Sequence, residues 1–162
     1  MKLDVARLPY QKQIEVTENV KFDAAKFVCH IPLVEVLSCT AKIKVQRFEE
    51  FIYVDLSIVS DVVLQCSYTL KQFRTTLKGN DELHFSSNLL DEEDDDIIVY
   101  KGTVIDLDEY IFNLLSACVP LSPKAPGAKI PEDGKGYRII SDEALSKEEK
   151  SSPFDVLEDL DL

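Results

Sequence analysis

The sequence predicts a single α+β domain: a twisted, mostly antiparallel β-sheet covered by one amphipathic helix, followed by a flexible acidic C-terminal tail. Three observations predict it: period-two alternation between residues 39 and 77, one capped helical segment after residue 106, and a change in composition after residue 123. The domain is expected to span residues 1–123. Residues 124–162 are expected to form a linker and an acidic tail with a short C-terminal helix.

The strand predictions come from alternating apolar and polar side chains. Over Cys39–Gln65 this alternation is interrupted only at Arg47–Glu50, which indicates a long antiparallel hairpin with one buried face. A third strand is predicted over about Tyr68–Leu77, and a short fourth strand around Leu83 and Phe85. Residues 1–6 are consistent with an edge strand or an ordered start, weaker alternation places two or three strand segments between residues 13 and 38, and residues 97–105 are predicted to form a strand.

The helix prediction combines a start signal, an apolar stripe and a stop signal. Asp106 is the predicted N-cap, and Glu109 completes a capping box. The stripe that follows at helical spacing consists of Leu107, Tyr110, Ile111, Leu114, Leu115 and Cys118. Pro120 and Pro123 prevent the helix from continuing. Burial of the larger side chains contributes about 1.5–3 kcal/mol each, against about 1 kcal/mol for the cap. The stability of this helix therefore depends mainly on its docking onto a sheet.

Charge is distributed unevenly along the chain. The net charge is −12, but residues 1–78 hold 11 Lys and Arg against 9 Asp and Glu, whereas residues 79–162 hold 7 against 21. Phosphate contacts supply most of the affinity of nucleic-acid binders. The chain is therefore expected to repel nucleic acid unless its basic residues gather on one face, and a basic protein is electrostatically the easier partner.

The sequence favours neither a calcium site nor a membrane span. The six consecutive carboxylates Asp91–Asp96 are predicted to form a solvated loop, because a calcium loop needs spaced oxygen ligands and a turn-forming glycine. No window approaches the roughly 18 uninterrupted apolar residues of a membrane span, and no signal-peptide pattern opens the sequence. We therefore expect a cytoplasmic protein without membrane contact.

The cysteines and histidines match no familiar metal or catalytic pattern. Without any C-x-x-C spacing, the four cysteines are expected to be reduced and mostly packed as small hydrophobic residues: Cys29, Cys39, Cys66 and Cys118. His30 adjoins Cys29, but successive residues on a strand point to opposite faces, which works against a thiol–imidazole pair. The sequence also lacks a glycine-rich phosphate loop, G-x-S-x-G and H-E-x-x-H. We expect no cofactor, metal or small-molecule substrate, and no enzymatic activity.

Several short motifs follow one another in a distinctive order. A β-hairpin leads to a cysteine motif, an acidic stretch, a strand and helix, and a double-proline turn, at positions Cys66, Leu70, Gly102, Ile105-Asp106-Leu107, Pro120 and Pro123. In this order the chain resembles the YceD family, the large ribosomal RNA subunit accumulation proteins. The resemblance extends from about Val34 to the C-terminus, and Ser152–Leu160 is similar to the short helix that closes many members. It marks Cys66, Asp106 and Pro120 as family-motif residues.

The chain departs from the family pattern at its cysteines. Tyr68 and Thr69 stand where the family has an arginine and a second cysteine, and residues 121–134 lack the cysteine that many members carry after the proline turn. A thiolate metal site built from those cysteines is therefore excluded here. Cys66 is expected to be a core residue, and Tyr68 and Thr69 ordinary strand residues.

The resemblance implies a non-catalytic ribosome-biogenesis factor. Such a factor supports accumulation of large-subunit (23S) ribosomal RNA by binding the rRNA precursor or a basic ribosomal protein. The candidate RNA-binding residues lie on the polar faces of two predicted strands and form one patch if these strands are neighbours: Lys42, Lys44, Arg74 and Lys78. For these charges alone, a solvated sheet face is the favoured interpretation.

A different class of function is an acidic protein-interaction module unrelated to ribosomes. In this alternative, the acidic second half and the helix-prone segment at residues 152–160 hold a basic partner. The sequence leaves the choice between RNA and protein open, as well as the binding surface and the oligomeric state.

Overall fold

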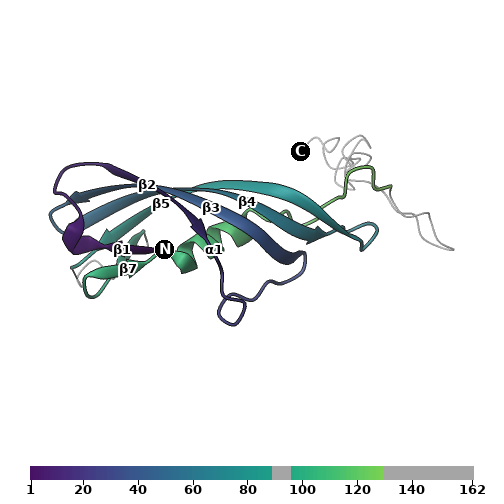
Figure 1. The fold of residues 1–162 in the computed structure, drawn as a ribbon, viewed down its shortest axis with the longest axis horizontal. Helices are drawn as coiled ribbons and strands as arrows, with labels where there is room; N and C mark the ends of the chain where they lie inside the picture. The colour runs from purple at the N-terminus through teal and green to yellow at the C-terminus, as the bar shows by residue number, and fades with distance from the viewer. Residues whose placement is uncertain (89–95, 130–162) are drawn as a thin grey trace, which may run out of the picture.

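A computed structural model describes residues 1–88 and 96–129 (Figure 1). Its main sheet has the strand order β2-β3-β4-β5-β6. These strands are β2 (Ile14–Val20), β3 (Leu33–Phe48), β4 (Phe51–Gln65), β5 (Gln72–Ser86) and β6 (Ile97–Val99). The other described elements are β1 (Lys2–Asp4), the 3-10 helix η1 (Val5–Arg7), β7 (Val104–Asp106) and the helix α1 (Asp108–Ala117).

The three long strands of the main sheet share one apolar face, which we call the inner face. Ile43 lies opposite Leu56 and Val45 lies opposite Val54 in the antiparallel register of β3 and β4, and all four side chains are buried. The two strands turn at residues 49–50, where Glu49 adopts a positive φ of 42°. This arrangement confirms the predicted long hairpin with one buried face.

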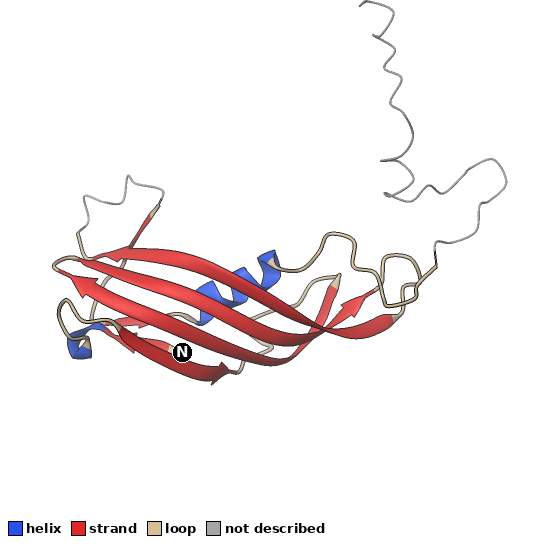
Figure 2. Cartoon of the chain, turned by 90° about the horizontal axis from the view of Figure 1, so that it is seen from above, coloured by secondary structure: helices blue, strands red, loops and turns tan. Residues whose placement is uncertain are grey.

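α1 packs on the inner face, and no described helix or strand packs on the opposite side of the sheet (Figures 1 and 2). The side chains of Leu107, Ile111 and Leu115 are completely buried where α1 meets the inner face. The structure thus agrees with the predicted α+β class, a mostly antiparallel sheet covered by one helix. The predicted tail and its short helix fall mainly on residues 130–162, outside the described residues.

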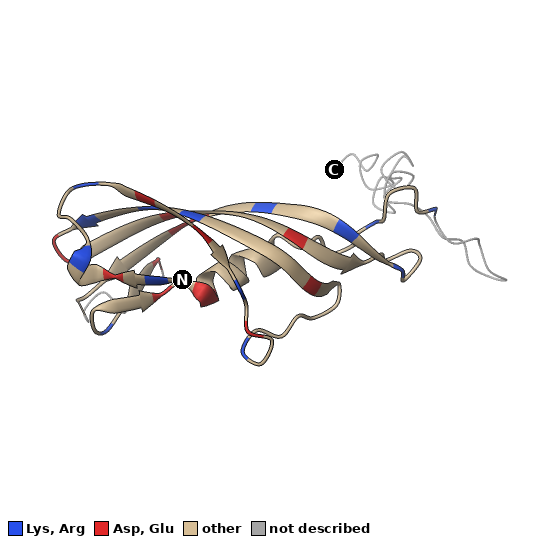
Figure 3. Cartoon of the chain, viewed as in Figure 1, with Lys and Arg blue, Asp and Glu red and all other residues tan. Residues whose placement is uncertain are grey.

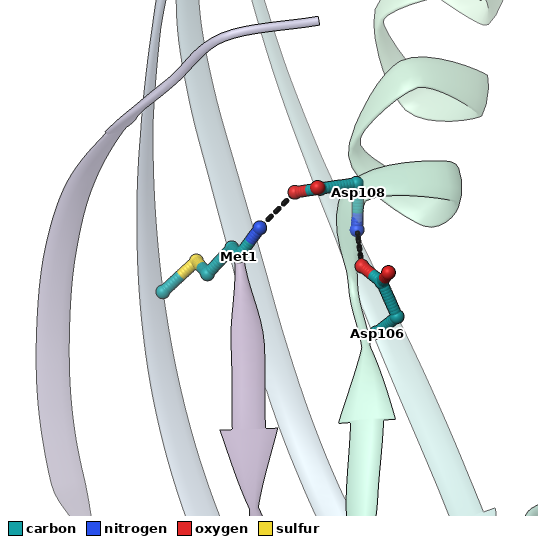
Figure 4. A network of polar contacts seen from close by, with 3 residues as sticks. All are labelled: Met1, Asp106 and Asp108. Atoms are coloured by element: carbon teal, nitrogen blue, oxygen red, sulfur yellow. Dashed lines mark hydrogen bonds and ion pairs between the residues drawn. The ribbon is translucent and has the colours of Figure 1, made fainter. Parts of the chain in front are cut away.

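Polar contacts to the N-terminal residue hold the start of α1 (Figure 4). The Met1 ammonium forms an ion pair with the Asp108 carboxylate, and the Leu107 N–H donates to the Met1 carbonyl at 2.9 Å. The Asp106 carboxylate accepts a hydrogen bond from the Asp108 N–H at 3.1 Å. Since the helix begins only at Asp108, Leu107 occupies the cap position, and the predicted capping box between Asp106 and Glu109 is wrong.

β5 is one continuous strand of 15 residues, so the prediction of a separate short strand around Leu83 and Phe85 is wrong. Gly79, in the middle of β5, lies opposite Ile58 in an unbroken antiparallel register. A Cβ atom at Gly79 would lie 2.4 Å from the Sγ atom of Cys118. The glycine therefore allows α1 to approach the strand closely, and it does not end the strand.

The segment predicted as one strand over residues 97–105 is two short strands in different sheets. β6 pairs in parallel with β5, whereas β7 pairs antiparallel with β1. Gly102, with a φ of 94°, lies in the turn between them, in a conformation that favours glycine. Among the described residues, no helix is long and apolar enough to cross a membrane.

Gly79→Ala is expected to lower the free energy of unfolding by about 1–3 kcal/mol, the usual cost of overpacking a core. The reason is the overlap of the added methyl group with the Cys118 thiol. Urea denaturation of wild type, Gly79→Ala, Cys118→Ala and the double variant measures this cost. In the double variant, Cys118→Ala is expected to recover part of the loss. A Gly79→Ala protein as stable as wild type would contradict the close approach.

Candidate functional site

The side of the main sheet opposite α1, which we call the outer face, is left bare by the described helices and strands. It consists of every second side chain of β2 to β5, because residues directly opposite each other in an antiparallel sheet share a face. One row across the four strands is Thr17, Lys42, Ser57 and Asn80. The outer face is thus a broad polar surface carried by regular backbone.

The structure places all four candidate RNA-binding cations on the outer face. Lys42 and Lys44 project from β3, Arg74 and Lys78 project from β5, and all four are exposed. The two strands are not neighbours, because β4 lies between them. Adjacent strands are about 4.8 Å apart, so β3 and β5 are roughly 10 Å apart. The two pairs of cations are also offset along the strands, because Lys42 lies level with Asn80 and Lys44 lies level with Glu82.

Carboxylates are interspersed among these cations. Glu15 forms an ion pair with Lys42 at 2.9 Å, and the hydrogen bond from Lys42 lowers the pKa of the Glu15 carboxyl group. Asp55 lies opposite Lys44 in the register, and Asp61 accepts a hydrogen bond from the Thr76 hydroxyl at 2.6 Å. Blue and red bands therefore alternate along the sheet (Figure 3). The outer face is a mixed surface and not a uniformly positive one.

An aromatic cluster occupies the end of the outer face near the β3–β4 turn. The Tyr53 ring lies edge-on to the Phe48 ring, with centroids 5.9 Å apart, and to the His84 imidazole, with centroids 5.0 Å apart. Phe51 is 6.5 Å from Tyr53 between ring centroids. Tyr53 is 40% exposed and Phe48 is 36% exposed. Exposed aromatic rings on a sheet are surfaces on which unpaired nucleic-acid bases stack.

Sequence reasoning missed this aromatic cluster, although part of the signal was present. The predicted hairpin places Phe48 opposite Phe51 across a two-residue turn, and Tyr53 two residues farther along the same face. The contact with His84 could not be predicted, because the sequence analysis placed His84 in a separate short strand and not in β5.

The family-motif residue Cys66 lies at a junction between the end of β4 and the segment that follows α1. Its Sγ atom accepts a hydrogen bond from the Ala125 N–H at 3.3 Å, and the neighbouring Ser67 N–H donates to the Pro123 carbonyl at 2.8 Å. Cys66 and Pro123 are buried. The hydrogen bond from Ala125, supported by the Thr69 hydroxyl, lowers the pKa of the Cys66 thiol to about 7.

The other family-motif residues have structural positions as well. Asp106 receives the hydrogen bond from Asp108 described above, at the start of α1. Pro120 follows the end of α1 and is exposed. Tyr68 and Thr69, expected to be strand residues, instead lie in the turn between β4 and β5, where the Lys124 ammonium is 5.0 Å from the centre of the Tyr68 ring.

The remaining thiols lack the environment of a nucleophile. Burial raises the pKa of Cys29, Cys39 and Cys118, which keeps these groups protonated near neutral pH. Cys29 and His30 lie in the loop before β3, not on a strand as assumed from the sequence. Within residues 1–88 and 96–129, no group of three His, Cys, Asp or Glu side chains is placed to hold a metal ion.

Cys66→Ala is expected to lower the urea midpoint of unfolding more than Cys66→Ser does. Alanine leaves the Ala125 N–H without its acceptor, whereas the serine hydroxyl is also an acceptor. A matched control is Cys39→Ala, which removes a buried thiol from the inner face. Equal effects of the alanine and serine substitutions at residue 66 would show that the hydrogen bond is unimportant.

The stabilising contribution of Cys66 is also expected to depend on pH. Its pKa is about 7 in the folded chain, below the ordinary thiol value of 9.0, so the contribution grows as the pH rises from 7 to 9. Urea denaturation across this range compares wild type with Cys66→Ser, which removes the thiol and leaves the other titrating groups in place. A stability difference that does not grow between pH 7 and 9 would contradict the lowered pKa.

Comparison with protein families identifies the chain. The model of the family described as "Large ribosomal RNA subunit accumulation protein YceD" matches residues 54–161, two thirds of the chain. The match begins within β4, later than the start near Val34 that the sequence motifs indicated, and includes both Cys66 and the double-proline turn. Comparisons with curated proteins and with solved structures find no match. The chain therefore belongs to the YceD family.

Proposed function

We propose that this protein is a non-catalytic ribosome-biogenesis factor that supports accumulation of large-subunit (23S) ribosomal RNA by binding the rRNA precursor. Family membership motivates the role in large-subunit RNA accumulation. The observation that supports RNA contact is the bare outer face, on which four cations and an exposed aromatic cluster share one rigid surface. Cations bind the phosphates, and aromatic rings stack on the bases.

The charge of the folded part supports this proposal. The described residues hold 14 Lys and Arg against 15 Asp and Glu, whereas residues 89–95 and 130–162 hold 4 against 15. Most of the net charge of −12 therefore comes from residues 89–95 and 130–162. A nearly neutral domain does not repel RNA in the way that the whole-chain charge suggests.

A binding role without catalysis accords with the titratable groups. A nucleophilic cysteine needs a lowered pKa, access to substrate and a nearby base. Cys66 has the lowered pKa but is completely buried, while burial raises the pKa of Cys29, the thiol next to His30 in the sequence. We also propose that the protein acts in the cytoplasm and needs no cofactor.

Lys42→Glu with Arg74→Glu is expected to abolish most binding to a fluorescent single-stranded fragment of the large-subunit rRNA precursor. The substitutions remove two of the proposed phosphate contacts and add repulsion on both strands that carry the cations, β3 and β5. Fluorescence anisotropy titrations over a range of salt concentrations measure the affinity. For single strands, log K falls with log salt by about 0.7 per phosphate contact, so losing two contacts reduces the slope by about 1.4.

The matched control is Lys26→Glu with Lys101→Glu, which changes the net charge equally at two exposed residues off the outer face. This control is expected to retain most of the affinity. Tyr53→Ala tests the aromatic cluster and is expected to weaken binding by about 1–3 kcal/mol, the value of one stacked base. Binding that is absent in wild type, insensitive to salt, or equally reduced by both charge pairs would exclude the outer face as an RNA surface.

A second candidate function is an escort that holds a basic ribosomal protein through its acidic segments. The observation that favours it is the concentration of acidic residues outside the described domain. Deleting residues 141–162 is then expected to remove ribosomal proteins from the material that co-purifies with the chain, measured by quantitative mass spectrometry. The outer-face variant Lys42→Glu with Arg74→Glu is the control and should retain them. An unchanged set of partners after the deletion would rule out the tail as the holding element.

A further inference from the structure

An apolar groove lies beside α1, on the opposite side of the sheet from the outer face. It is a hollow of about 300 Å³ between the C-terminal half of α1 and the loop before β3, and Phe112 and Cys29 are among its lining residues. Three other apolar lining residues are strongly exposed: Val28 by 56%, Ile31 by 75% and Leu121 by 98%. Single exposed apolar residues are ordinary, but several around one hollow mark a docking surface.

We propose that residues 152–160 of this same chain bind in this groove as a short amphipathic helix. Ser152 supplies an N-cap and Pro153 the first helical position, both typical of helix starts. Phe154, Leu157 and Leu160 follow at intervals of three residues and form one apolar stripe. The family match extends to residue 161, so this segment belongs to the same family unit as the folded domain.

The folded domain directs the chain past this groove. Pro120 and Leu121, just after α1, line the groove itself. The following residues are fixed by the hydrogen bond from the Ala125 N–H to Cys66 Sγ. On the groove side, the Pro32 carbonyl accepts from the Gln65 N–H at 2.9 Å. The groove and the segment at Ala125 therefore contact neighbouring residues: Gln65, the last residue of β4, and Cys66, which follows it.

The length of the connecting chain suits an intramolecular contact. Residues 130–151 separate the last described residue from Ser152, and the random-coil relation gives an average span of about 25 Å for this number of residues. A linker of this reach gives a local concentration on the order of millimolar, so a weak apolar contact suffices for docking. A separate partner would need much higher affinity to occupy the same groove.

The charges of the two parts are complementary. Residues 152–162 contain no Lys or Arg and four carboxylates, at Asp155, Glu158, Asp159 and Asp161. The described groove lining contains no carboxylate, and the chain that leads into its residues 28–32 carries Lys21 and Lys26 against a single carboxylate at Asp23. Burial of the apolar stripe therefore stabilises the contact. The negative charge of the tail and the lysines beside the groove favour this occupant over a basic one.

Two native cysteines provide the test in the full-length chain. Cys29 lines the groove, whereas Cys118 packs against Gly79 on β5. Both are half-buried, and burial raises the pKa of both, so each rate is compared with the wild-type rate of the same thiol. Alkylation by iodoacetamide, followed residue by residue with peptide mass spectrometry, measures the protection of each thiol.

Leu157→Ser with Leu160→Ser is expected to raise the alkylation rate of Cys29 by about tenfold, the protection given by a docked state favoured ten to one. The rate at Cys118 should stay the same. The control, Leu162→Ser, replaces an apolar residue of the same tail outside the proposed helix and should leave both rates at their wild-type values.

A substitution from the groove side completes the test. Ile31→Ser alters a side chain that is 75% exposed, and it should also raise the Cys29 rate but add nothing in the Leu157→Ser, Leu160→Ser background. An unchanged Cys29 rate in the tail variant, a parallel rise at Cys118, or an equal effect of the control would overturn the proposal. Protection lost on dilution would overturn it too, since it would assign the groove to a second copy.

Discussion

The close packing of α1 on the inner face is the contact on which the rest of the structure depends. A helix of ten residues is marginal in water on its own, so its stability comes from the burial of Leu107, Ile111 and Leu115. Gly79 makes this approach possible, because any Cβ there would overlap the Cys118 thiol. Once one face of the sheet is committed to the helix, the outer face is the side left for contacts with other molecules.

The end of α1 organises a second region of the molecule. After the helix the chain passes Pro120, and residues 123–125 are then held against Cys66 and Ser67 at the end of β4. This junction connects two family motifs that are far apart in the sequence. It also gives the motif cysteine a structural role, because its sulfur accepts a backbone hydrogen bond that fixes the course of the chain.

The sequence predicted the features that depend on local pattern. Alternation revealed the β3–β4 hairpin, and helical spacing together with two prolines revealed α1 to within about one residue at each end. The sequence did not predict the features that depend on contacts between residues far apart in the chain. Gly79 is needed inside β5 because Cys118, 39 positions away, packs against it, and Gly102 separates two short strands that pair with β5 and β1. The arrangement of the four cations on the outer face could not be predicted without the order of the strands, because β4 lies between β3 and β5 and separates them.

The mixed charge of the outer face bears on how it would recognise RNA. Four cations interspersed with carboxylates supply less long-range attraction than a uniform basic patch, and Lys42 already has a partner in Glu15. A surface of this kind gains more from short-range stacking on Tyr53 and Phe48 than from charge alone. Stacking requires unpaired bases, so single-stranded or looped segments fit this face better than a duplex, whose bases are already stacked on one another. The groove lies on the other side of the sheet, with α1. A tail docked there leaves the aromatic cluster and all four cations accessible.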